Sequence, residues 1–565
     1  MCLLVFVRAI LAAEVKIVMN RLLIPASLAA LAALAGVATA EEFNPGESIW
    51  VQFGDPDQVH GLYLLDWAES PLVTRGGRYG RETSQALYFR VDPRFLHEPM
   101  PVRVVVEYWD EGTDFFLLRY GSTDTEGQHR GEDKRTCECF RTDTRTWQQV
   151  VFRLPDARFV GSAWDKDFSV RLDHWFGIDR QKLIVSGVEV VKGGVYLSAS
   201  PEAVPADGET PARVEARVYD RSGSLVRDGT PVQLACTAGT IEPRTAVTAD
   251  GRAIAAFTGT RRPGSADITA TALGDSQTII VPMLEGKGPI HEVTYVLDDF
   301  LQPERWRIHN SEDVEGRLAI DNVMAFRKRP VARWDYHFRR QVGRIRWSRR
   351  IPIPGRVKRL SIWANEDSSG SELSMYFRDA AGAEVNWILP KMWSRGWRWG
   401  WEDIGRPWDR YGECDFRISW PITLDYLDFV RYRLEPDVGE IGTIYFQDLA
   451  ATCLVPESSL VWPRVELGTP REEAPGRMAP CEVLVHNLGD EAYRGLCLEV
   501  AVIDHVGRSS VREEATFSLA PREIKTFDCS FRPKHWGDNT VEAQVRGGSI
   551  DAVGRSVLAI GPLRD

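Results

Sequence analysis

The fold is indicated most clearly by the stretch Ala206-Asp-Gly-Glu-Thr-Pro-Ala-Arg-Val-Glu-Ala-Arg-Val-Tyr-Asp220 and, further along, by Asp250-Gly-Arg-Ala-Ile-Ala-Ala-Phe257. Each contains an Asp-Gly turn followed by residues that alternate between apolar and polar types. Because successive side chains of a strand point to opposite faces, this alternation predicts half-buried β-strands. Similar short runs, separated by Gly, Pro, Asp and Asn, continue along the chain, and helix signals are nearly absent beyond residue 40. The pattern predicts an all-β fold of tandem β-sandwiches.

Length and composition narrow the class of protein. At about 100–200 residues per domain, the 565 residues correspond to roughly three to five domains. A chain that is 44% hydrophobic and 26% charged is too apolar to be disordered. The formal net charge of −11 argues against nucleic acid as a partner, because nucleic-acid binding requires an excess of basic groups.

The first 40 residues have the features of a signal peptide. Met19-Asn-Arg21 gives a basic start, Leu22 to Val37 is apolar, and Ala38-Thr-Ala40 is a small-x-small cleavage signature. We therefore expect a mature chain that begins at Glu41 and is secreted, or located at the cell surface or in the periplasm. No later segment has the run of about 18 apolar residues that a membrane span requires, so no span is expected after cleavage.

Eight cysteines follow the predicted cleavage point, at positions 137, 139, 236, 414, 453, 481, 497 and 529. This number is too small for a disulfide scaffold in a chain of this length. Buried thiols or isolated disulfides are expected, and the sequence does not define a connectivity.

Two segments resemble Ig-like domains. In residues 194–284, the two stretches quoted above are joined by the turn Gly229-Thr-Pro231 and by a closing strand, Ala266-Asp-Ile-Thr-Ala-Thr-Ala272. This block resembles the bacterial Ig-like domain of the invasin/intimin type, which implies a rigid, noncatalytic spacer. Residues 456–565 contain the strands Cys481-Glu-Val-Leu-Val-His-Asn487 and Leu498-Glu-Val-Ala-Val-Ile-Asp504, and resemble C-terminal Ig-like domains of cell-surface proteins.

Residues 285–455 carry four short motifs. These are Leu360-Ser-Ile-Trp-Ala-Asn-Glu-Asp367, Met375-Tyr-Phe-Arg-Asp-Ala-Ala-Gly382, Gly396-Trp-Arg398 and Gly442-Thr-Ile-Tyr-Phe-Gln-Asp-Leu449. Their succession resembles the galactose-binding-like jelly roll of carbohydrate-binding modules attached to secreted glycosidases. Residues 41–193, with Val104-Val-Val-Glu-Tyr-Trp-Asp-Glu-Gly112 and Trp147-Gln-Gln-Val-Val-Phe-Arg-Leu154, resemble a more divergent jelly roll of the same kind.

The jelly-roll resemblance also implies a structural Ca²⁺ between the first and last strands of residues 285–455. Asp298, Asp299 and Asp448 match the positions at which that family places oxygen ligands, and oxygen donors suit Ca²⁺. Solvated acidic side chains in turns are the alternative interpretation.

A tryptophan-rich segment within the same block supplies the candidate ligand site. Trp397, Trp399 and Trp401 alternate, so they share one face of a strand, and the family's Gly-Trp motif implies that this face points into the sandwich interior. Other aromatic residues lie beside Gly, Ser and Pro in predicted loops, where packing alone does not explain them. The predicted ligand-binding residues are Trp393, Arg395, Trp408, Arg410 and Tyr411.

The segment 327–359 is strongly basic, with 13 Lys and Arg residues and one acid, Asp335. Aromatic residues are interleaved with it, namely Trp334, Tyr336, Phe338 and Trp347. A basic strand pair lined with aromatic side chains could hold an anionic polysaccharide, since Arg pairs well with carboxylate or sulfate. A solvated sheet face is the alternative.

No catalytic motif is present. The sequence contains no G-x-S-x-G, H-E-x-x-H or P-loop motif, and the sandwiches leave no stretch of about 250 residues for a barrel enzyme. The sequence thus predicts a noncatalytic carbohydrate-binding protein whose partner is a polysaccharide, either neutral or anionic. Two alternatives stay open: an adhesin-like or structural envelope protein, and a divergent glycoside hydrolase.

Overall fold

The computed structural model describes residues 46–65, 70–113, 115–123, 134–136, 139–159, 166–172, 182–310, 314–339, 342–367, 371–388, 395–403, 418–432, 440–467, 478–504, 506–532 and 537–560. The predicted signal peptide, residues 1–40, lies outside these ranges. Residues 47–565 form one compact unit. In the described part of the chain, no helix is long and apolar enough to cross a membrane.

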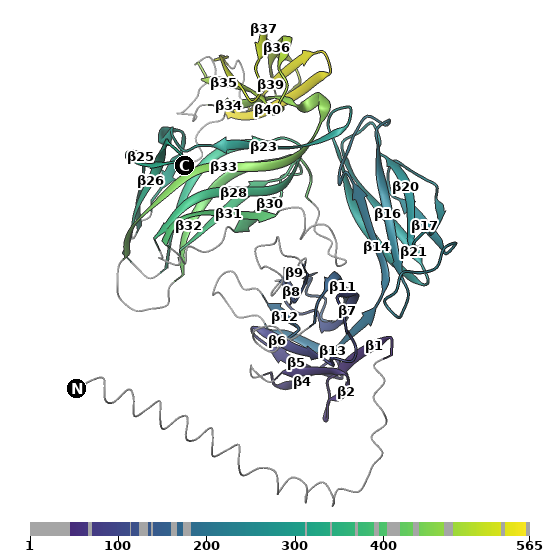
Figure 1. Ribbon diagram of the computed structural model, residues 1–565. Coiled ribbons are helices and arrows are strands. Elements are labelled where there is room, and N and C mark those ends of the chain that lie inside the picture. The colour runs from purple at the N-terminus through teal and green to yellow at the C-terminus, as the bar shows by residue number, and fades with distance from the viewer. Residues whose placement is uncertain are drawn as a thin grey trace, which may run out of the picture. The chain divides into compact units, whose positions relative to one another are not determined.

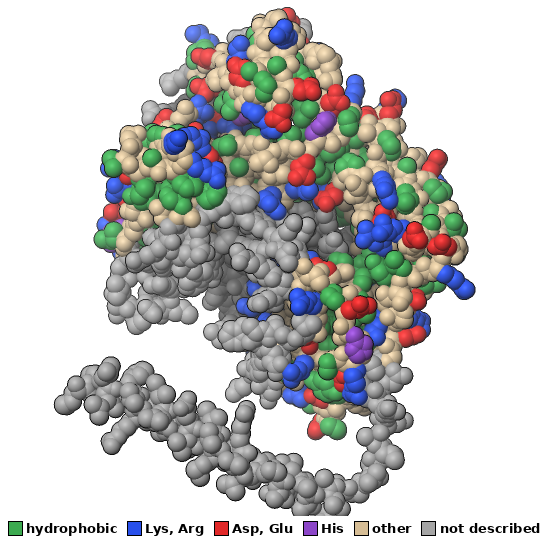
Figure 2. All heavy atoms as spheres, viewed as in Figure 1, with side chains coloured by type: hydrophobic (Ala, Val, Ile, Leu, Met, Phe, Trp, Pro, Cys, Tyr) green, Lys and Arg blue, Asp and Glu red, His purple; other side chains and the backbone are tan. Residues whose placement is uncertain are grey.

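The predicted all-β fold is confirmed. The strands form eight sheets, which occur as four successive pairs along the chain (Figure 1). Among the described residues, the only helical elements are two short 3-10 turns, η1 (Pro303–Arg305) and η2 (Glu457–Ser459). On the face shown in Figure 2, basic and acidic side chains are interspersed over the described surface.

The first sandwich contains a seven-stranded and a six-stranded sheet. The seven-stranded sheet has the order β11-β7-β13-β1-β2, with β5 paired to β13 and β4 paired to β5, and the other has the order β10-β8-β12-β6-β3, with β9 paired to β8. The strands are β1 (Ser48–Gln52), β2 (Gln58–His60), β3 (Leu62–Leu65), β4 (Leu72–Arg75), β5 (Arg78–Thr83), β6 (Ala86–Val91), β7 (Met100–Trp109), β8 (Phe115–Tyr120), β9 (Lys134–Arg135), β10 (Cys139–Phe140), β11 (Trp147–Ala157), β12 (Phe168–Leu172) and β13 (Leu183–Lys192).

The second sandwich pairs a four-stranded sheet, β14-β16-β20-β18, with a five-stranded sheet, β15-β22-β21-β17-β19. Its strands are β14 (Gly194–Ser200), β15 (Val204–Pro205), β16 (Pro211–Tyr219), β17 (Pro231–Cys236), β18 (Thr240–Glu242), β19 (Thr245–Val247), β20 (Arg252–Thr258), β21 (Gly264–Ala272) and β22 (Asp275–Leu284). The alternation of β16 places Ala212, Val214, Ala216 and Val218 in the core, as the sequence predicts.

The third sandwich pairs a six-stranded sheet, β25-β26-β33-β28-β31 with β23 also paired to β33, with a five-stranded sheet, β24-β27-β32-β29-β30. Its strands are β23 (Ile290–Asp298), β24 (Arg307–His309), β25 (Val314–Phe326), β26 (Arg329–Phe338), β27 (Val342–Ile353), β28 (Arg356–Asp367), β29 (Glu372–Arg378), β30 (Glu384–Ile388), β31 (Arg395–Asp403), β32 (Ile422–Tyr432) and β33 (Glu440–Pro456). The fourth sandwich pairs β34-β35-β38 with β37-β36-β39-β40, and its strands are β34 (Val461–Leu467), β35 (Cys481–Asn487), β36 (Tyr493–Ile503), β37 (Ser509–Leu519), β38 (Ile524–Asp528), β39 (Gly537–Gly547) and β40 (Ile550–Ile560).

The aromatic residues of the basic segment 327–359 lie in the core of the third sandwich. Trp334, Phe338 and Trp347 are fully buried and Tyr336 is 3% exposed. The interpretation in which these aromatic rings line a binding surface is therefore wrong, whereas the role of the basic side chains stays a prediction. In a strand, residues of opposite parity face opposite sides, so the aromatic residues of β26 and β27 fill the interior.

The third and fourth sandwiches share one continuous apolar core. Buried charges also join them: Glu466 of β34 accepts hydrogen bonds from Arg305 (2.9 Å) and Arg349 (3.0 Å) of the third sandwich, and from Arg464. Burial alone would raise the pKa of Glu466, but the charges of Arg464 and Arg349 hold it below its usual value. His486 of β35 lies against the rings of Tyr295 and Trp462 at the same junction.

One carboxylate is central to the junction between the first sandwich and the Ig-like sandwich. Asp275, at the start of β22, accepts hydrogen bonds from Arg103 of β7 (2.8 Å) and from both terminal nitrogens of Arg153 of β11 (2.8 and 2.9 Å). The backbone N–H of Val195 also donates to it, at 2.8 Å. The Arg153 side chain is only 7% exposed, so this ion pair fixes the junction at which one residue, Gly193, separates β13 from β14.

We expect Asp275→Asn to destabilise the junction by about 3 kcal/mol, because it leaves the buried Arg153 guanidinium without its charge partner. Calorimetry should show a lower midpoint for the transition that includes the Ig-like sandwich. Glu209→Gln, at a carboxylate of the same sandwich that is 76% exposed, is the control. An unchanged midpoint in Asp275→Asn would contradict the assigned role.

A second expectation concerns pH. Burial and the nearby charge of Arg464 lower the pKa of His486 from 6.5 to about 3, so between these values the unfolded chain binds a proton that the folded chain does not. Stability is therefore complete above pH 6.5 and falls as the pH drops, with a slope of up to about 1.4 kcal/mol per pH unit. Urea unfolding at pH 7, 6 and 5 should show this slope in the wild type and in His97→Phe, at an exposed histidine. It should be smaller in His486→Phe, and an equal slope would refute the assignment.

Candidate functional site

The six-stranded sheet of the third sandwich has one face on the core and the opposite face turned away from it. Along β28, Leu360, Ile362 and Ala364 are buried in the core. Trp363 and Asn365 have the opposite parity and are half-buried on the other face. Figure 1 shows β28 between β31 and β33 in this sheet, so the neighbours of Trp363 and Asn365 across the strands identify what else this face displays.

Strand register aligns four residues across this face. Trp397 of β31 is paired with Asn365 of β28, Asn365 with Tyr445 of β33, and Tyr445 with Arg333 of β26. We call these four residues the cross-sheet row. With neighbouring strands about 4.8 Å apart, three spacings give the row a length of about 14 Å. The row is therefore longer than a single monosaccharide-sized ligand.

The aromatic end of the row is reinforced by the hairpin between β25 and β26. Phe326 stacks on Trp397 with ring centroids 4.1 Å apart and planes at 13°, and lies 5.0 Å from the ring of Trp363. The turn residue Arg327 places its guanidinium 4.2 Å from the centre of the Trp363 ring. Stacking of this kind holds the rings in fixed orientations.

The prediction that Trp397 packs in the sandwich interior is wrong. Trp397 is half-buried, stacks on Phe326 and is paired with Asn365 on the face opposite the core. Trp399 and Trp401 are paired in register with Trp363 and Ser361, and their side chains lie outside the described set. The sequence Leu360-Ser-Ile-Trp-Ala-Asn365 already indicates an aromatic residue on the outer face. Leu360, Ile362 and Ala364 share one face of the strand, so Trp363 lies on the other.

The polar end of the row supplies hydrogen-bonding groups. Arg333 is 44% exposed and donates to Asp335 at 2.9 Å, and Asp335 also accepts from the Thr443 hydroxyl at 2.6 Å. The face thus combines flat aromatic rings with an amide, a phenol, a guanidinium and a carboxylate. Rings of this type contact the C–H face of a pyranose, while the polar groups hydrogen-bond to its hydroxyls.

The residues predicted from the loops are only partly placed. Trp393, Trp408, Arg410 and Tyr411 lie outside the described residues. Arg395 is the first residue of β31, where its backbone is opposite Asp367, and its side chain is not among those described. These residues stay a prediction.

The three predicted calcium ligands have other partners. Asp298, 6% exposed, forms an ion pair with Arg349 and accepts from the N–H of Phe300 at 2.6 Å. Asp299 accepts from the N–H of Leu301 at 3.0 Å, and Asp448 forms an ion pair with Arg329. The pairing of β23 with β33 does bring Asp298 opposite Leu449, next to Asp448.

The side chains nevertheless do not form a cation site. Oδ1 of Asp448 is buried without a hydrogen-bond partner, which would suit a cation, but Asp298 and Asp448 engage different arginines. In the described part of the chain, no three His, Cys, Asp or Glu side chains gather as metal ligands. The set as it stands does not fit a Ca²⁺ ion, and calcium binding stays a prediction of the sequence.

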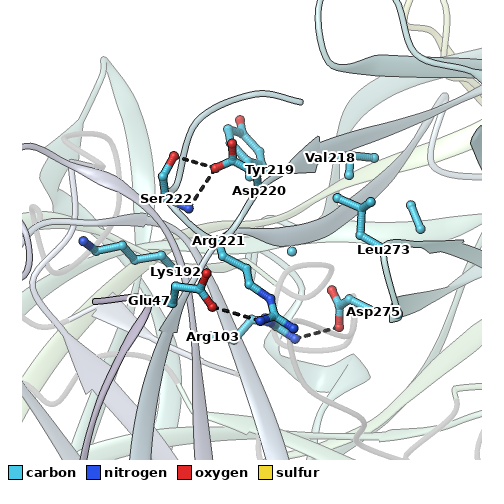
Figure 3. Close-up of a pocket in the computed structure, with 13 residues that line it drawn as sticks. Glu47, Arg103, Lys192, Val218, Tyr219, Asp220, Arg221, Ser222, Leu273 and Asp275 are labelled. Carbon is cyan, nitrogen blue, oxygen red and sulfur yellow. Dashed lines mark hydrogen bonds and ion pairs between the residues drawn. The ribbon is translucent and has the colours of Figure 1, made fainter. Parts of the chain in front are cut away.

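A separate cleft of about 720 Å³ lies between the first sandwich and the Ig-like sandwich (Figure 3). Its charged side chains largely pair with each other: Arg221 with Glu47 at 3.0 Å and Arg103 with Asp275 at 2.8 Å. The ion pairs of the junction thus account for most of the charged lining, and the cleft does not by itself indicate a ligand class.

Comparison with known proteins identifies one domain. Residues 195–282 match the family of bacterial Ig-like domains (group 1), which confirms the Ig-like domain predicted for this segment. No curated protein sequence matches the chain.

Solved structures with similar architecture are all distant in sequence. A carbohydrate-binding module of the β-sandwich superfamily is 11% identical, with 47% of this chain and 98% of the module covered and a TM-score of 0.21. The β-glucuronidase of Bacteroides uniformis is 15% identical over 38% of this chain and 26% of the enzyme, with a TM-score of 0.18. The D0–D1 domain of intimin is 14% identical over 35% of this chain and 89% of its own, with a TM-score of 0.16. At these TM-scores, none of the similarities bears on what this chain binds.

The ion pair of Asp298 leads to a test of its role. Because Arg349 is only 9% exposed, Asp298→Asn should destabilise the protein by about 3 kcal/mol in the presence or absence of EDTA. Asp299→Asn, which changes a carboxylate without an ion-pair partner among the described residues, should stay within about 0.5 kcal/mol of the wild type. Thermal unfolding with and without EDTA measures both. A loss of stability that EDTA reproduces in the wild type would instead support the predicted Ca²⁺ site.

Proposed function

We propose that this protein is an exported, noncatalytic carbohydrate-binding protein, and that the cross-sheet row of the third sandwich is its glycan-binding surface. The observation that carries the proposal is the position of Trp397 and Trp363: both are half-buried on the face opposite the core. Contiguous apolar groups on a protein surface often mark interaction sites, and here polar groups accompany the two rings across the strands.

The contacts of the row favour a polysaccharide over a small apolar ligand. The row is about 14 Å long, as the strand spacing requires, and three of its four residues are polar. Asn365, Tyr445 and Arg333 provide both donors and acceptors. A glycan chain that lies across the strands would meet ring faces at one end and hydrogen-bonding groups at the other.

The predicted loop residues extend this surface along the chain. Strand β31, which carries Trp397, directly follows the segment that contains Trp393 and directly precedes the segment that contains Trp408, Arg410 and Tyr411. Arg395 lies two residues before Trp397 and shares its strand parity. Of the predicted residues, Arg395 is thus the one whose backbone position adjoins the cross-sheet row.

The remaining sandwiches have supporting roles in this proposal. The Ig-like domain separates the two predicted jelly rolls, and its ion-paired junction with the first sandwich makes it a stiff spacer. The predicted signal peptide places the mature chain in the periplasm, at the cell surface or outside the cell. An adhesin-like role, in which the sandwiches contact protein, is the alternative that the Ig-like match favours.

The test is a glycan array and polysaccharide pull-down with the mature chain, residues 41–565. We expect Trp397→Ala to weaken glycan binding at least tenfold, a loss of about 1.4 kcal/mol or more, because it removes one of the two tryptophan rings that the aromatic stack contributes to the row. Tyr79→Ala removes an aromatic side chain that is 49% exposed in the first sandwich and should bind as the wild type does. Trp393→Ala/Trp408→Ala tests the predicted loops in the same assay.

Unchanged binding in Trp397→Ala, with its fold intact by circular dichroism, would remove the cross-sheet row as the site. Loss of binding in Trp393→Ala/Trp408→Ala alone would locate the site in the loops. Absence of binding to any glycan by the wild type would refute the carbohydrate-binding function and favour the adhesin-like alternative.

A further inference from the structure

The five-stranded sheet of the third sandwich displays a second, chemically different face. Along β27, Ile345 and Trp347 are fully buried, whereas Arg344 and Arg346 have the opposite parity and point away from the core. Neighbouring strands add arginines to this face: Arg307 of the edge strand β24 is paired with Ser348, and Arg378 of β29 follows the buried Phe377. We call the set the arginine strip; it consists of Arg307, Arg344, Arg346, Arg350 and Arg378.

Two carboxylates of β32 show how the strip holds an acidic group. Asp428, whose side chain is fully buried, accepts from Nε and a terminal nitrogen of Arg346 at 2.9 and 3.1 Å. Arg344 approaches the same carboxylate at 3.5 Å. Asp425 repeats the arrangement, because Arg378 donates to it at 2.9 Å and Arg350 lies 3.4 Å from its other oxygen.

Aromatic stacking fixes one of these guanidinium groups. The guanidinium carbon of Arg346 lies 3.6 Å from the ring centre of Tyr426, and Tyr426 stacks on Tyr376 with centroids 4.4 Å apart and planes at 19°. The hydroxyl of Tyr426 donates to Glu384 at 3.2 Å. Arg346 is therefore committed to Asp428 and Tyr426, and Arg344 is the second cation at a carboxylate that is already held at two points.

The strip thus carries more positive than negative charge. Among the described side chains of this face, its five arginines meet three acids, Asp425, Asp428 and Glu384. Arg344 and Arg350 are the more distant of the two arginines at Asp428 and Asp425, respectively. Their side chains are 56% and 63% exposed. In a protein with a net charge of −11, this local excess is opposite in sign to the whole molecule.

We propose that the arginine strip binds the carboxylate groups of an acidic polysaccharide. This inference rests on the proposed function, which makes the ligand a polysaccharide. The arginine strip adds that this polysaccharide is negatively charged. Guanidinium groups bind carboxylates through two parallel hydrogen bonds, and the Arg346–Asp428 pair shows that geometry on this face. Arg344 and Arg350 would form the same contact with uronate groups from solution, with Arg307 of the edge strand as a further cation.

The strip and the cross-sheet row belong to opposite sheets of one sandwich, with the core between them. They are therefore separate surfaces, and substitutions in one do not touch side chains of the other. A ligand whose binding depends on the strip must lose affinity with salt, since exposed ion pairs are screened, whereas stacking on the row is insensitive to moderate salt.

The experiment measures binding of the mature chain to polygalacturonate by affinity electrophoresis and calorimetry. We expect Arg344→Ala/Arg350→Ala to weaken binding at least tenfold, and raising the salt from 50 to 300 mM to weaken wild-type binding similarly. Arg262→Ala/Arg494→Ala removes two exposed arginines from other sandwiches and should leave binding unchanged. Arg344→Lys/Arg350→Lys keeps the charge but not the bidentate geometry, and should give an intermediate affinity.

Fully methyl-esterified polygalacturonate should bind no more tightly to the wild type than to the Arg344→Ala/Arg350→Ala variant. Equal affinity of the two double-alanine variants for polygalacturonate would overturn the proposal, as would equal or tighter binding of dextran sulfate, which would indicate a general polyanion surface. Failure of the cross-sheet row as the glycan site is recognised separately, because Trp397→Ala would then leave every glycan affinity unchanged while the strip variants still respond to polygalacturonate. Failure of the carbohydrate-binding function itself would appear as absence of wild-type binding to every glycan, polygalacturonate included.

Discussion

The contact between Trp334 and Trp347 determines what the third sandwich can display. Both side chains are fully buried, their ring centroids are 4.4 Å apart, and they come from different sheets, β26 and β27. Gly316 makes room for this contact, since a Cβ there would lie 2.1 Å from the Trp334 ring. Once these two rings meet, the parity of every residue along β26 and β27 is fixed. Arg333 must then face outward on one side of the sandwich, and Arg344 and Arg346 on the other.

The same constraint separates two kinds of chemistry within one small domain. The sheet of β26, β33, β28 and β31 carries aromatic and polar groups outward, with Arg333 paired to Asp335, and the sheet of β27, β32 and β29 carries an excess of arginines. Because the core is shared, neither face can be shifted by one residue without exposing Trp334 or Trp347. The strand register that buries Trp334 and Trp347 thus also determines which side chains each sheet exposes.

Much of the fold could be predicted from the sequence because strand alternation is a local property. The Ig-like segment 194–284 and the all-β class were recognised from such local patterns. The errors arose where two signals overlapped. In Trp334-Asp-Tyr-His-Phe338, aromatic and polar residues alternate. The two-residue repeat of a strand puts the three aromatic side chains on one face, and this face is the core. Trp397 was assigned to the interior from a motif, whereas its register with Asn365 places it on the outer face.

Other features could not be predicted because they depend on non-local pairing. The sequence predicts Asp298 as a metal ligand. In the structure, however, its ion-pair partner is Arg349, which is 51 positions away on another sheet. Phe326 and Trp397 are separated by 71 positions and stack only because the β25–β26 hairpin reaches across the sheet. The candidate residues in loops are the easiest to notice in the sequence. The residues that the structure brings together lie on four different strands, and only the strand register aligns them.

The junctions between sandwiches add a mechanical argument. Asp275 holds Arg103 and Arg153 across one junction, and Glu466 holds Arg305, Arg349 and Arg464 across another. Charges buried in this way are costly unless paired, so each junction resists opening more than a hydrated linker would. The two surfaces that we propose for glycan binding, the cross-sheet row and the arginine strip, both lie on the third sandwich, so the core of that sandwich sets their separation. The Glu466 junction continues this core into the fourth sandwich and thereby supports the strands that carry both surfaces.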